Sequence, residues 1–288
     1  MTPTDFPGRV PVRSRFVDVG GIRTHYLTAG DGPRTVVLLH SGEFGASAEL
    51  CWEHNIGALA EHFRVVAPDW LGFGQTDKLH DFVSKSDRMV RHLAAFLRTL
   101  DIGRAYFVGA SMGATRLVAE AARDHRPRLP IAAMVLVSGG GFVPDNEHRR
   151  ALLGYDGSTD GMRAILRACL ADRRWADDDR YVSRRVAASL VPGAWESVAA
   201  ARLKAPNVPA RADFGQADTT EYERVKVPTL AVAGAKDLLR EPGYHHALER
   251  IPGARVVVLD DAGHLLNIER AAEFNALAVD FLLELEGS

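Results

Sequence analysis

The chain has 288 residues, of which 47% are hydrophobic and 25% charged, and its formal net charge is -2 at pH 7. This balance is typical of a globular protein and argues against a general attraction to nucleic acid. Every apolar run is shorter than the roughly 18 residues of a membrane-spanning helix, and the N-terminal stretch lacks the apolar core of a secretion signal. We therefore expect a cytoplasmic protein with neither nucleic acid nor membrane as a partner.

Short apolar runs alternate with helix-period segments along most of the chain. This alternation indicates an α/β protein with a mainly parallel sheet covered by helices on both faces. The expected strands cover residues 15–19, 22–28, 36–39, 63–67, 106–108, 134–137, 229–232 and 256–259, and the first two are joined by Gly20-Gly21 as a hairpin. The clearest helix covers residues 87–100, with Val90, Leu93 and Leu97 on one face.

The strand pattern disappears after about residue 140, where the sequence becomes helical and highly charged, and it returns at Val227. An inserted helical unit explains this better than two tandem domains, because the last two strands would otherwise have no sheet to join. We predict a core of residues 1–140 and 227–288 and a helical cap of residues 141–226. The apolar cap residues expected to roof a pocket are Leu152, Leu153, Ile165, Leu166 and Leu170.

The segment Gly109-Ala110-Ser111-Met112-Gly113 lies between an expected strand and a helix-period stretch at residues 114–123. This placement is typical of a nucleophile elbow, in which a serine occupies a strained turn and glycines avoid collisions with nearby backbone. The G-x-S-x-G pattern alone occurs by chance in roughly one chain in ten of this length. The prediction therefore depends on the placement, and an ordinary Gly-Ser turn is the alternative.

A serine hydroxyl becomes a nucleophile when an adjacent base is oriented by a third group. Asp237 and His264 each follow an expected strand, at residues 229–232 and 256–259. Serine, aspartate and histidine in this order is the arrangement of a triad on such a sheet. We predict Ser111 as nucleophile, His264 as general base and Asp237 as orienting carboxylate, with no metal or organic cofactor.

The oxyanion formed by serine attack on a carbonyl needs N–H donors that are held in place beforehand. We expect one from Met112, at the positive end of the helix that follows Ser111, and one from Gly42 in the loop at residues 40–45. His40 is expected to brace this loop. Asp69 also follows a strand, and it is expected to stabilise a glycine-rich turn.

Other polar and thiol groups are expected to have structural roles. The run at residues 177–179 is interpreted as a solvated helix start, and His245-His246 lacks a partner pair at zinc-site spacing and is expected on the surface. Cys51 and Cys169 are far apart in the sequence, so we expect two reduced, buried thiols.

These residues resemble the α/β-hydrolase superfamily over nearly the whole chain. The resemblance is strongest to the meta-cleavage product hydrolases, which hydrolyse a carbon–carbon bond in vinylogous 1,5-diketones during aromatic ring degradation. It implies an α/β-hydrolase fold, with a mostly parallel eight-stranded sheet and an inserted helical cap. The matching segments are residues 40–47, 58–65, 67–74, 111–113 and 272–282.

In that subfamily a cap arginine binds the substrate carboxylate next to the dienol, and its helical segment resembles residues 178–185. The resemblance implies Arg184 as the substrate-binding residue. The alternatives are that its neighbour Arg185 has this role, or that Arg184 is a solvent-facing arginine on a charged helix.

The chain also departs from the subfamily around the expected pocket. Ala110 stands where an asparagine is usual, Leu265 where a tryptophan is usual, and Phe44 where a proline is usual. Losing an amide and an indole N–H predicts a more apolar pocket. Glu43 would repel an anion if it faced the pocket, so it points to solvent, or it pairs with a cap arginine, or the substrate is not an acid.

The resemblance and the predicted triad together imply a serine hydrolase that acts on a small molecule with an activated carbonyl. Carbon–carbon bond hydrolysis of a vinylogous diketone is favoured over a neutral ester or lactone, for which a carboxylesterase or lactonase is the alternative. A catalytically silent receptor of the same fold is a second alternative, which is disfavoured because a pure binder needs no triad. A homodimer is left open.

Overall fold

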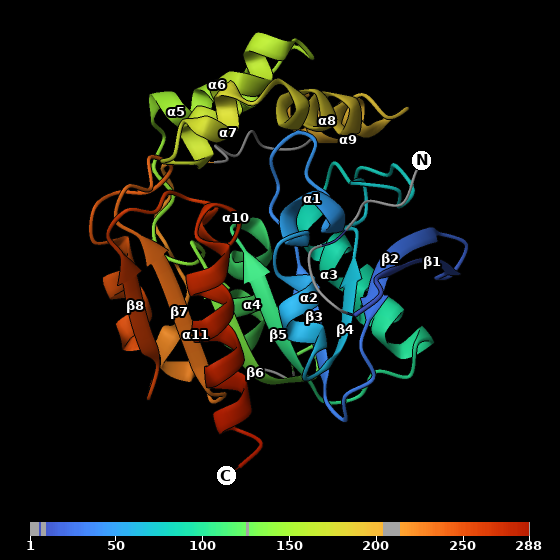
Figure 1. Ribbon diagram of the computed structural model, residues 1–288, viewed down its shortest axis with the longest axis vertical. Helices are drawn as coiled ribbons and strands as arrows, with labels where there is room; N and C mark the ends of the chain where they lie inside the picture. Colours follow the sequence, from blue (N-terminus) through green and yellow to red (C-terminus); the bar gives the residue numbers. More distant parts are fainter. Residues whose placement is uncertain (1–5, 7–9, 125–126, 204–213, 288) are drawn as a thin grey trace.

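The computed structural model of the chain describes residues 6, 10–124, 127–203 and 214–287. Its strands are β1 (Arg13–Asp18), β2 (Arg23–Ala29), β3 (Thr35–Leu39), β4 (Arg64–Pro68), β5 (Ala105–Ala110), β6 (Ile131–Val137), β7 (Thr229–Gly234) and β8 (Arg255–Leu259). They form an eight-stranded sheet in the order β1-β2-β4-β3-β5-β6-β7-β8 (Figure 1). Strand β2 is antiparallel to both of its neighbours, whereas β3 to β8 run parallel. The mostly parallel eight-stranded sheet predicted from the sequence is confirmed.

Helices cover both faces of this sheet, and alternate strand residues enter separate apolar cores. The covering helices are α1 (Ala48–Trp52), α2 (Ile56–Ala60), α3 (Lys85–Thr99), α4 (Met112–Ala121), α10 (Leu266–Glu269) and α11 (Ala271–Glu284). Val37 and Leu39 of β3 pack in the core beneath α3 and α4, while Val36 and Leu38 pack in the core beneath α2 and α11. Because both faces are covered, β5 and β7 are buried at every residue, which explains their continuous apolar sequences.

Between β6 and β7 the described residues form helices and loops but no strand. The helices are α5 (Glu147–Leu153), α6 (Thr159–Cys169), α7 (Arg174–Asp177), α8 (Asp179–Ser189) and α9 (Ala194–Ala199), followed by the 3₁₀ helices η1 (Ala200–Arg202) and η2 (Tyr222–Arg224). Figure 1 shows α5 to α9 as a layer at one end of the sheet, beyond α1 and α10. These helices share an apolar cluster with Phe44, Leu239 and Leu265 from core loops. The exact division between core and cap stays a prediction, and residues 204–213 of the predicted cap lie outside the described residues.

Local sequence signals account for several element boundaries. The helix predicted at residues 87–100 is α3, in which Val90, Leu93 and Leu97 are buried as expected. The carboxylate of Asp178 accepts the N–H groups of Arg180 and Tyr181 at the start of α8, as expected of an acidic helix start. None of the described helices is both long and apolar enough to cross a membrane.

Candidate active site

Ser111 lies in the turn between β5 and α4, where its φ of 51° and ψ of -109° form a strained conformation for a residue with a side chain. A Cβ at Gly109 would lie 2.6 Å from the backbone nitrogen of Ala114. A Cβ at Gly113 would lie 2.2 Å from the carbonyl oxygen of Leu39. Glycine is therefore needed on both sides of Ser111 for the helix to approach the sheet this closely.

The structure brings Ser111, His264 and Asp237 into one chain of hydrogen bonds. His264 Nε2 lies 2.6 Å from Ser111 Oγ, and His264 Nδ1 lies 2.7 Å from Asp237 Oδ2. Asp237 Oδ1 accepts the N–H of Leu239 at 2.9 Å, which fixes the orientation of the carboxylate. The His264 and Asp237 side chains are each only 2% exposed. This is the geometry by which a base, oriented by a carboxylate, activates a serine hydroxyl.

The environment of His264 favours the neutral ring. Burial lowers the pKa of His264 below its ordinary value, although the Asp237 carboxylate acts in the opposite direction. The charges of Arg149 and Arg240 add to the lowering of this pKa. With Nδ1–H donated to Asp237, Nε2 is left as the acceptor that faces Ser111.

The two residues expected to donate to an oxyanion lie against each other. A Cβ at Gly42 would lie 2.7 Å from Met112 Sδ, so the loop after β3 can approach α4 because residue 42 lacks a side chain. Met112 is the first residue of α4, where a backbone N–H has no partner within the helix. Gly42 and Met112 line the same cavity as Ser111 and His264.

Two buried side chains brace the loops around this site, as the sequence indicates. His40 Nδ1 lies 2.7 Å from the carbonyl oxygen of the next residue, and its Nε2 accepts the N–H of Trp70 at 2.9 Å. The carboxylate of Asp69 accepts the N–H groups of Ala48 and Gln75 at 2.7 and 2.8 Å. His40 and Asp69 therefore hold these loops together through hydrogen bonds to backbone groups.

A second serine, histidine and aspartate share the same connectivity away from the cavity. Ser14 Oγ lies 2.9 Å from His25 Nε2, and His25 Nδ1 lies 2.7 Å from Asp69 Oδ2. Ser14 is exposed within the edge strand β1, with no following helix to supply N–H donors. These three residues do not line the cavity beside Ser111. Sequence reasoning missed this hydrogen-bonded group because Ser14 and His25 belong to no local motif.

A cavity of about 410 Å³ adjoins Ser111 and His264. Its apolar wall residues are Phe44, Met112, Val143, Leu152, Leu153, Cys169, Val198, Ala201, Phe214 and Leu239. Its charged wall residues are Glu43, Lys85, Arg116, Arg149 and Arg240. The expected apolar pocket is therefore only partly present, because basic side chains share the wall. Of the predicted roof residues, Leu152 and Leu153 line the cavity, whereas Ile165, Leu166 and Leu170 are buried within the helical layer.

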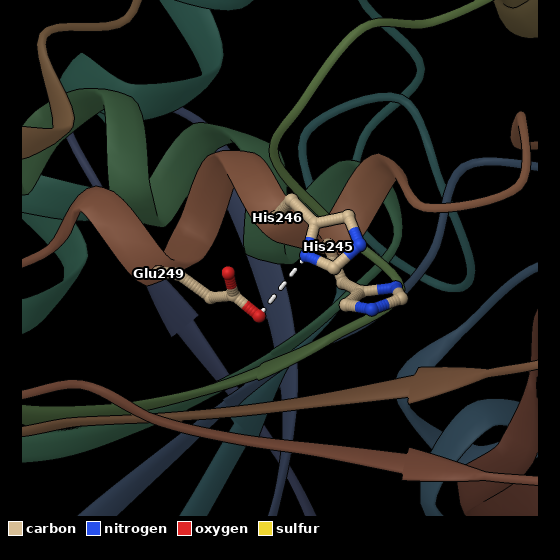
Figure 2. A group of neighbouring side chains, drawn as sticks. All are labelled: His245, His246 and Glu249. Carbon is tan, nitrogen blue, oxygen red and sulfur yellow. Dashed lines mark ion pairs between the residues drawn. The ribbon is translucent and has the colours of Figure 1, made fainter.

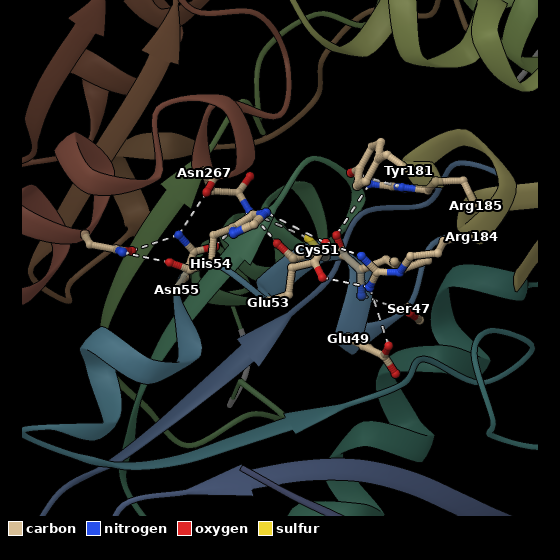
Figure 3. Close-up of polar contacts among 12 residues, drawn as sticks. Ser47, Glu49, Cys51, Glu53, His54, Asn55, Tyr181, Arg184, Arg185 and Asn267 are labelled. Carbon is tan, nitrogen blue, oxygen red and sulfur yellow. Dashed lines mark hydrogen bonds and ion pairs between the residues drawn. The ribbon is translucent and has the colours of Figure 1, made fainter. Parts of the chain in front are cut away.

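The arginine implied as substrate-binding does not line this cavity. Arg184 NH2 lies 2.7 Å from Glu53 Oε2 and 3.6 Å from Glu49 Oε1 of α1 (Figure 3). Its neighbour Arg185 is also absent from the wall, because it is fully buried with NH1 2.7 Å from Glu43 Oε1. Pairing with a cap arginine is thus the outcome for Glu43. The sequence could not separate Arg184 from Arg185, since adjacent helix residues point about 100° apart and helix rotation decides which partner each one meets.

Of the other residues implied to bind substrate, only Phe44 lines the cavity. Ala110 and Leu265 are both 0% exposed and lie outside the wall. Leu265 packs instead among the helices of the cap layer, and its N–H donates to the carbonyl of Cys169 at 3.0 Å. Cys169 and Cys51 are free and buried, as expected.

Glu269 is a further buried polar residue near His264, and sequence reasoning missed it. Its carboxylate accepts the N–H of Gly263, and it accepts the N–H of Asp172 at 2.9 Å. A Cβ at Gly263 would lie 2.7 Å from the nitrogen of Ala171, so the segment after α6 packs directly on the loop that carries His264. No sequence motif marks Glu269, because its partners are backbone groups that only the tertiary fold brings together.

One group in the described part of the chain has the side chains of a metal site. The ligand atoms of His245, His246 and Glu249, all in the 3₁₀ helix η3 (Tyr244–Arg250), lie within 4.8 Å of one another (Figure 2). His246 Nδ1 lies 3.1 Å from Glu249 Oε1, and both side chains are more than half exposed. The group lies outside the cavity, as expected of surface histidines, and it has fewer ligands than a structural zinc site.

The fold and this site define a member of a known enzyme class. The sequence signature of the family described as alpha/beta hydrolase fold matches residues 35–271. The chain belongs to this family, and it is a hydrolase.

Comparison with individual relatives shows which members of the family the chain resembles. The 2-hydroxy-6-oxo-6-(2'-aminophenyl)hexa-2,4-dienoic acid hydrolase of Metapseudomonas resinovorans is 34% identical over 274 residues, which cover 93% of this chain and 90% of that protein. The solved structure of a meta-cleavage product hydrolase from Pseudomonas fluorescens IP01 has a TM-score of 0.81 at 29% identity, covering 94% of this chain and 98% of that one. The enol-lactonase from Burkholderia xenovorans LB400 has a TM-score of 0.73 at 27% identity, covering 93% and 100%. The resemblance to meta-cleavage product hydrolases is confirmed.

Proposed function

We propose that the chain is a serine hydrolase of activated carbonyl compounds, with Ser111 as nucleophile, His264 as general base and Asp237 as the orienting carboxylate. The observation that carries this proposal is the hydrogen-bonded chain of these three residues, with distances of 2.6 and 2.7 Å. The strained turn at Ser111 and the adjoining cavity add support, because they leave room for a substrate carbonyl beside the hydroxyl.

The proposed reaction starts with attack of Ser111 Oγ on the substrate carbonyl while His264 Nε2 accepts the hydroxyl proton. The N–H groups of Gly42 and Met112 stabilise the oxyanion that forms. The imidazolium, stabilised by Asp237, then protonates the leaving group, and an acyl ester remains on Ser111. Water activated by His264 hydrolyses that ester and restores the serine hydroxyl.

We favour a vinylogous diketone as substrate, so that the leaving group is carbon, because the relative with 34% identity is named as a hydrolase of an oxo-hexadienoic acid. A lactone or neutral ester is the second candidate, and the structural likeness to an enol-lactonase supports it. A silent receptor is disfavoured by the hydrogen-bonded triad. The small-molecule substrate, the cytoplasmic location, the homodimer and the absence of cofactor and metal stay predictions.

Labelling with a fluorophosphonate tests the proposed nucleophile. We expect Ser111→Ala to lose the label and several orders of magnitude in turnover, since triad residues act as a unit. Ser14→Ala is the matched control, because Ser14 has the same hydrogen-bond connectivity outside the cavity. Labelling that persists in Ser111→Ala, or disappears in Ser14→Ala, would contradict the assignment. Values of kcat/KM for an aryl ester, a lactone and a vinylogous diketone then identify the leaving group.

A further inference from the structure

The cavity wall has an excess of positive charge. Arg116, Arg149 and Arg240 all line the cavity, and in the described part of the chain none of them forms an ion pair with a carboxylate. The acidic wall residue Glu43 is already neutralised by Arg185 at 2.7 Å. Arg149 and Arg240 are buried and Arg116 is partly buried. A cation withdrawn from water without a counter-ion is unfavourable unless a ligand supplies the missing charge.

Two of these three guanidinium groups are held by backbone carbonyls. Arg149 donates from Nε and NH2 to the carbonyl of Leu239, at 3.2 and 2.7 Å. Arg240 donates to the carbonyls of Ser138 and Phe142, at 2.9 and 3.3 Å. Their hydrogen bonds fix the loops around Asp237, so both residues have a structural reason to be where they are.

Arg116 has fewer hydrogen bonds to the described part of the protein than Arg149 or Arg240. Its NH2 donates to Ser86 Oγ at 3.2 Å, and its Nε is buried without a partner in the described structure. Its guanidinium carbon lies 5.8 Å from the centroid of the Trp70 ring. A guanidinium has five N–H donors, and one of those of Arg116 is engaged in the described structure, so others are left for a ligand. Burial lowers the pKa of Arg116 to about 10, which still leaves the group charged at neutral pH.

The position of Arg116 relates it directly to the triad. It belongs to α4, the helix that begins immediately after Ser111. Met112 and Arg116 are one helical turn apart, so they share a face of α4, and both line the cavity. An anionic group bound at Arg116 would therefore occupy the same cavity as a carbonyl bound at Ser111.

We propose that Arg116 is the specificity-determining residue of this pocket and binds a carboxylate of the substrate through charge-assisted hydrogen bonds. This inference rests on the proposed function, because it states which residue binds the carboxylate of the substrate that Ser111 attacks. In this proposal the substrate carboxylate is bound by Arg116 on α4, the helix that follows Ser111. It is not bound by the cap residue Arg184, which pairs with Glu53.

Paired inhibitors test the proposal. Hydrolysis of the neutral ester 4-nitrophenyl butyrate is the readout, and sorbate and its uncharged amide are the competitors. We expect the natural chain to bind sorbate more tightly than sorbamide. Arg116→Gln should weaken sorbate about ten- to a hundredfold and leave sorbamide little changed. Arg116→Lys, which keeps the charge, should recover part of the preference. Arg184→Gln is the matched control and should retain it in full.

The outcomes separate this inference from the proposed function. If 4-nitrophenyl butyrate and the other carbonyl substrates are not hydrolysed, the proposed function fails. Calorimetric titration of the natural chain and of Arg116→Gln with sorbate and sorbamide then still tests Arg116, and the absence of a preference for sorbate in the natural chain would overturn its assignment. If the ester is hydrolysed but Arg116→Gln keeps the preference for sorbate, or Arg184→Gln loses it, the assignment to Arg116 is wrong. Thermal unfolding of each variant checks that the fold is intact.

Discussion

Glu43, in the loop that holds Gly42, and Arg185, on α8, form a buried ion pair with 2.7 Å between Oε1 and NH1. The two side chains are 4% and 0% exposed. Arg185 also donates to the Tyr181 hydroxyl at 2.9 Å. Burial alone would raise the pKa of Glu43, but the Arg185 guanidinium and local hydrogen bonds hold it below its ordinary value. The pair therefore links the expected oxyanion loop to the helical layer above it.

Removing the charge of Glu43 should destabilise the protein. We expect Glu43→Gln to lower the free energy of unfolding by about 3–5 kcal/mol, because Arg185 would stay buried without a counter-ion. Urea unfolding measures this difference. Glu61→Gln, at an exposed position, is the control and should stay within about 0.5 kcal/mol of the natural chain. Equal stabilities for the two variants would show that the Glu43–Arg185 pair contributes nothing.

The contribution of Glu43 to the free energy of unfolding should also depend on pH. Its pKa in the folded protein is depressed below the ordinary value of 4.5, so the charged form favours the folded state. The stabilisation is fully present above about pH 4.5 and is lost as the pH falls through the lowered folded-state pKa. We expect the difference in unfolding free energy between the natural chain and Glu43→Gln to shrink in that acidic range. A difference that stays constant down to the acid limit of folding would contradict the titration of Glu43.

The pH profile of hydrolysis should report the buried His264. A general base works in its neutral form, and burial lowers the pKa of His264 from 6.5. We expect kcat/KM to fall on the acid side with an apparent pKa below 6.5, and to be level through neutral pH. His246→Gln, outside the cavity, should give the same profile. An acid limb centred at or above pH 6.5 would mean that His264 is not the titrating base in this environment.

Arg184 should matter for stability more than for substrate choice. We expect Arg184→Ala to leave the ratio of kcat/KM for acidic and neutral substrates nearly unchanged, since Arg184 does not line the cavity. The unfolding free energy should fall by about 1–3 kcal/mol, because Glu53, whose side chain is 6% exposed, loses its 2.7 Å partner. A selective loss of efficiency on acidic substrates would instead return the substrate-binding role to Arg184.

Glu269 should act as a positioning residue for His264. Glu269→Gln replaces a carboxylate oxygen, which accepts a backbone N–H, by an amide NH₂ that cannot. We expect kcat to fall about ten- to a hundredfold with little change in KM, because a displaced base affects the reaction more than binding. Glu273→Gln, at an exposed position of α11, is the control. An unchanged kcat together with a lower melting temperature would limit Glu269 to a structural role.

The strand pattern and the order of the triad residues are readable from the sequence alone. Apolar runs identified the strands, although β6 begins at Ile131, before the predicted residue 134, because the small alanines at 132 and 133 interrupt the pattern of large apolar residues. Ser111, Asp237 and His264 each follow a strand that was identified from local composition. Since the carboxyl ends of parallel strands meet at one edge of a sheet, their convergence followed from sequence order.

The partners of the charged side chains were decided only by the tertiary structure. Glu43 and Arg185 are 142 residues apart in the chain, and no local pattern relates them. Whether Arg184, Arg185 or Arg116 meets the cavity depends on how α8 and α4 are rotated against the loops that they contact. A helix sequence shows which residues share a face, but the neighbour of that face is set by packing. The sequence therefore determined the order of Ser111, Asp237 and His264 along the chain, and packing determined which charged side chains line the cavity.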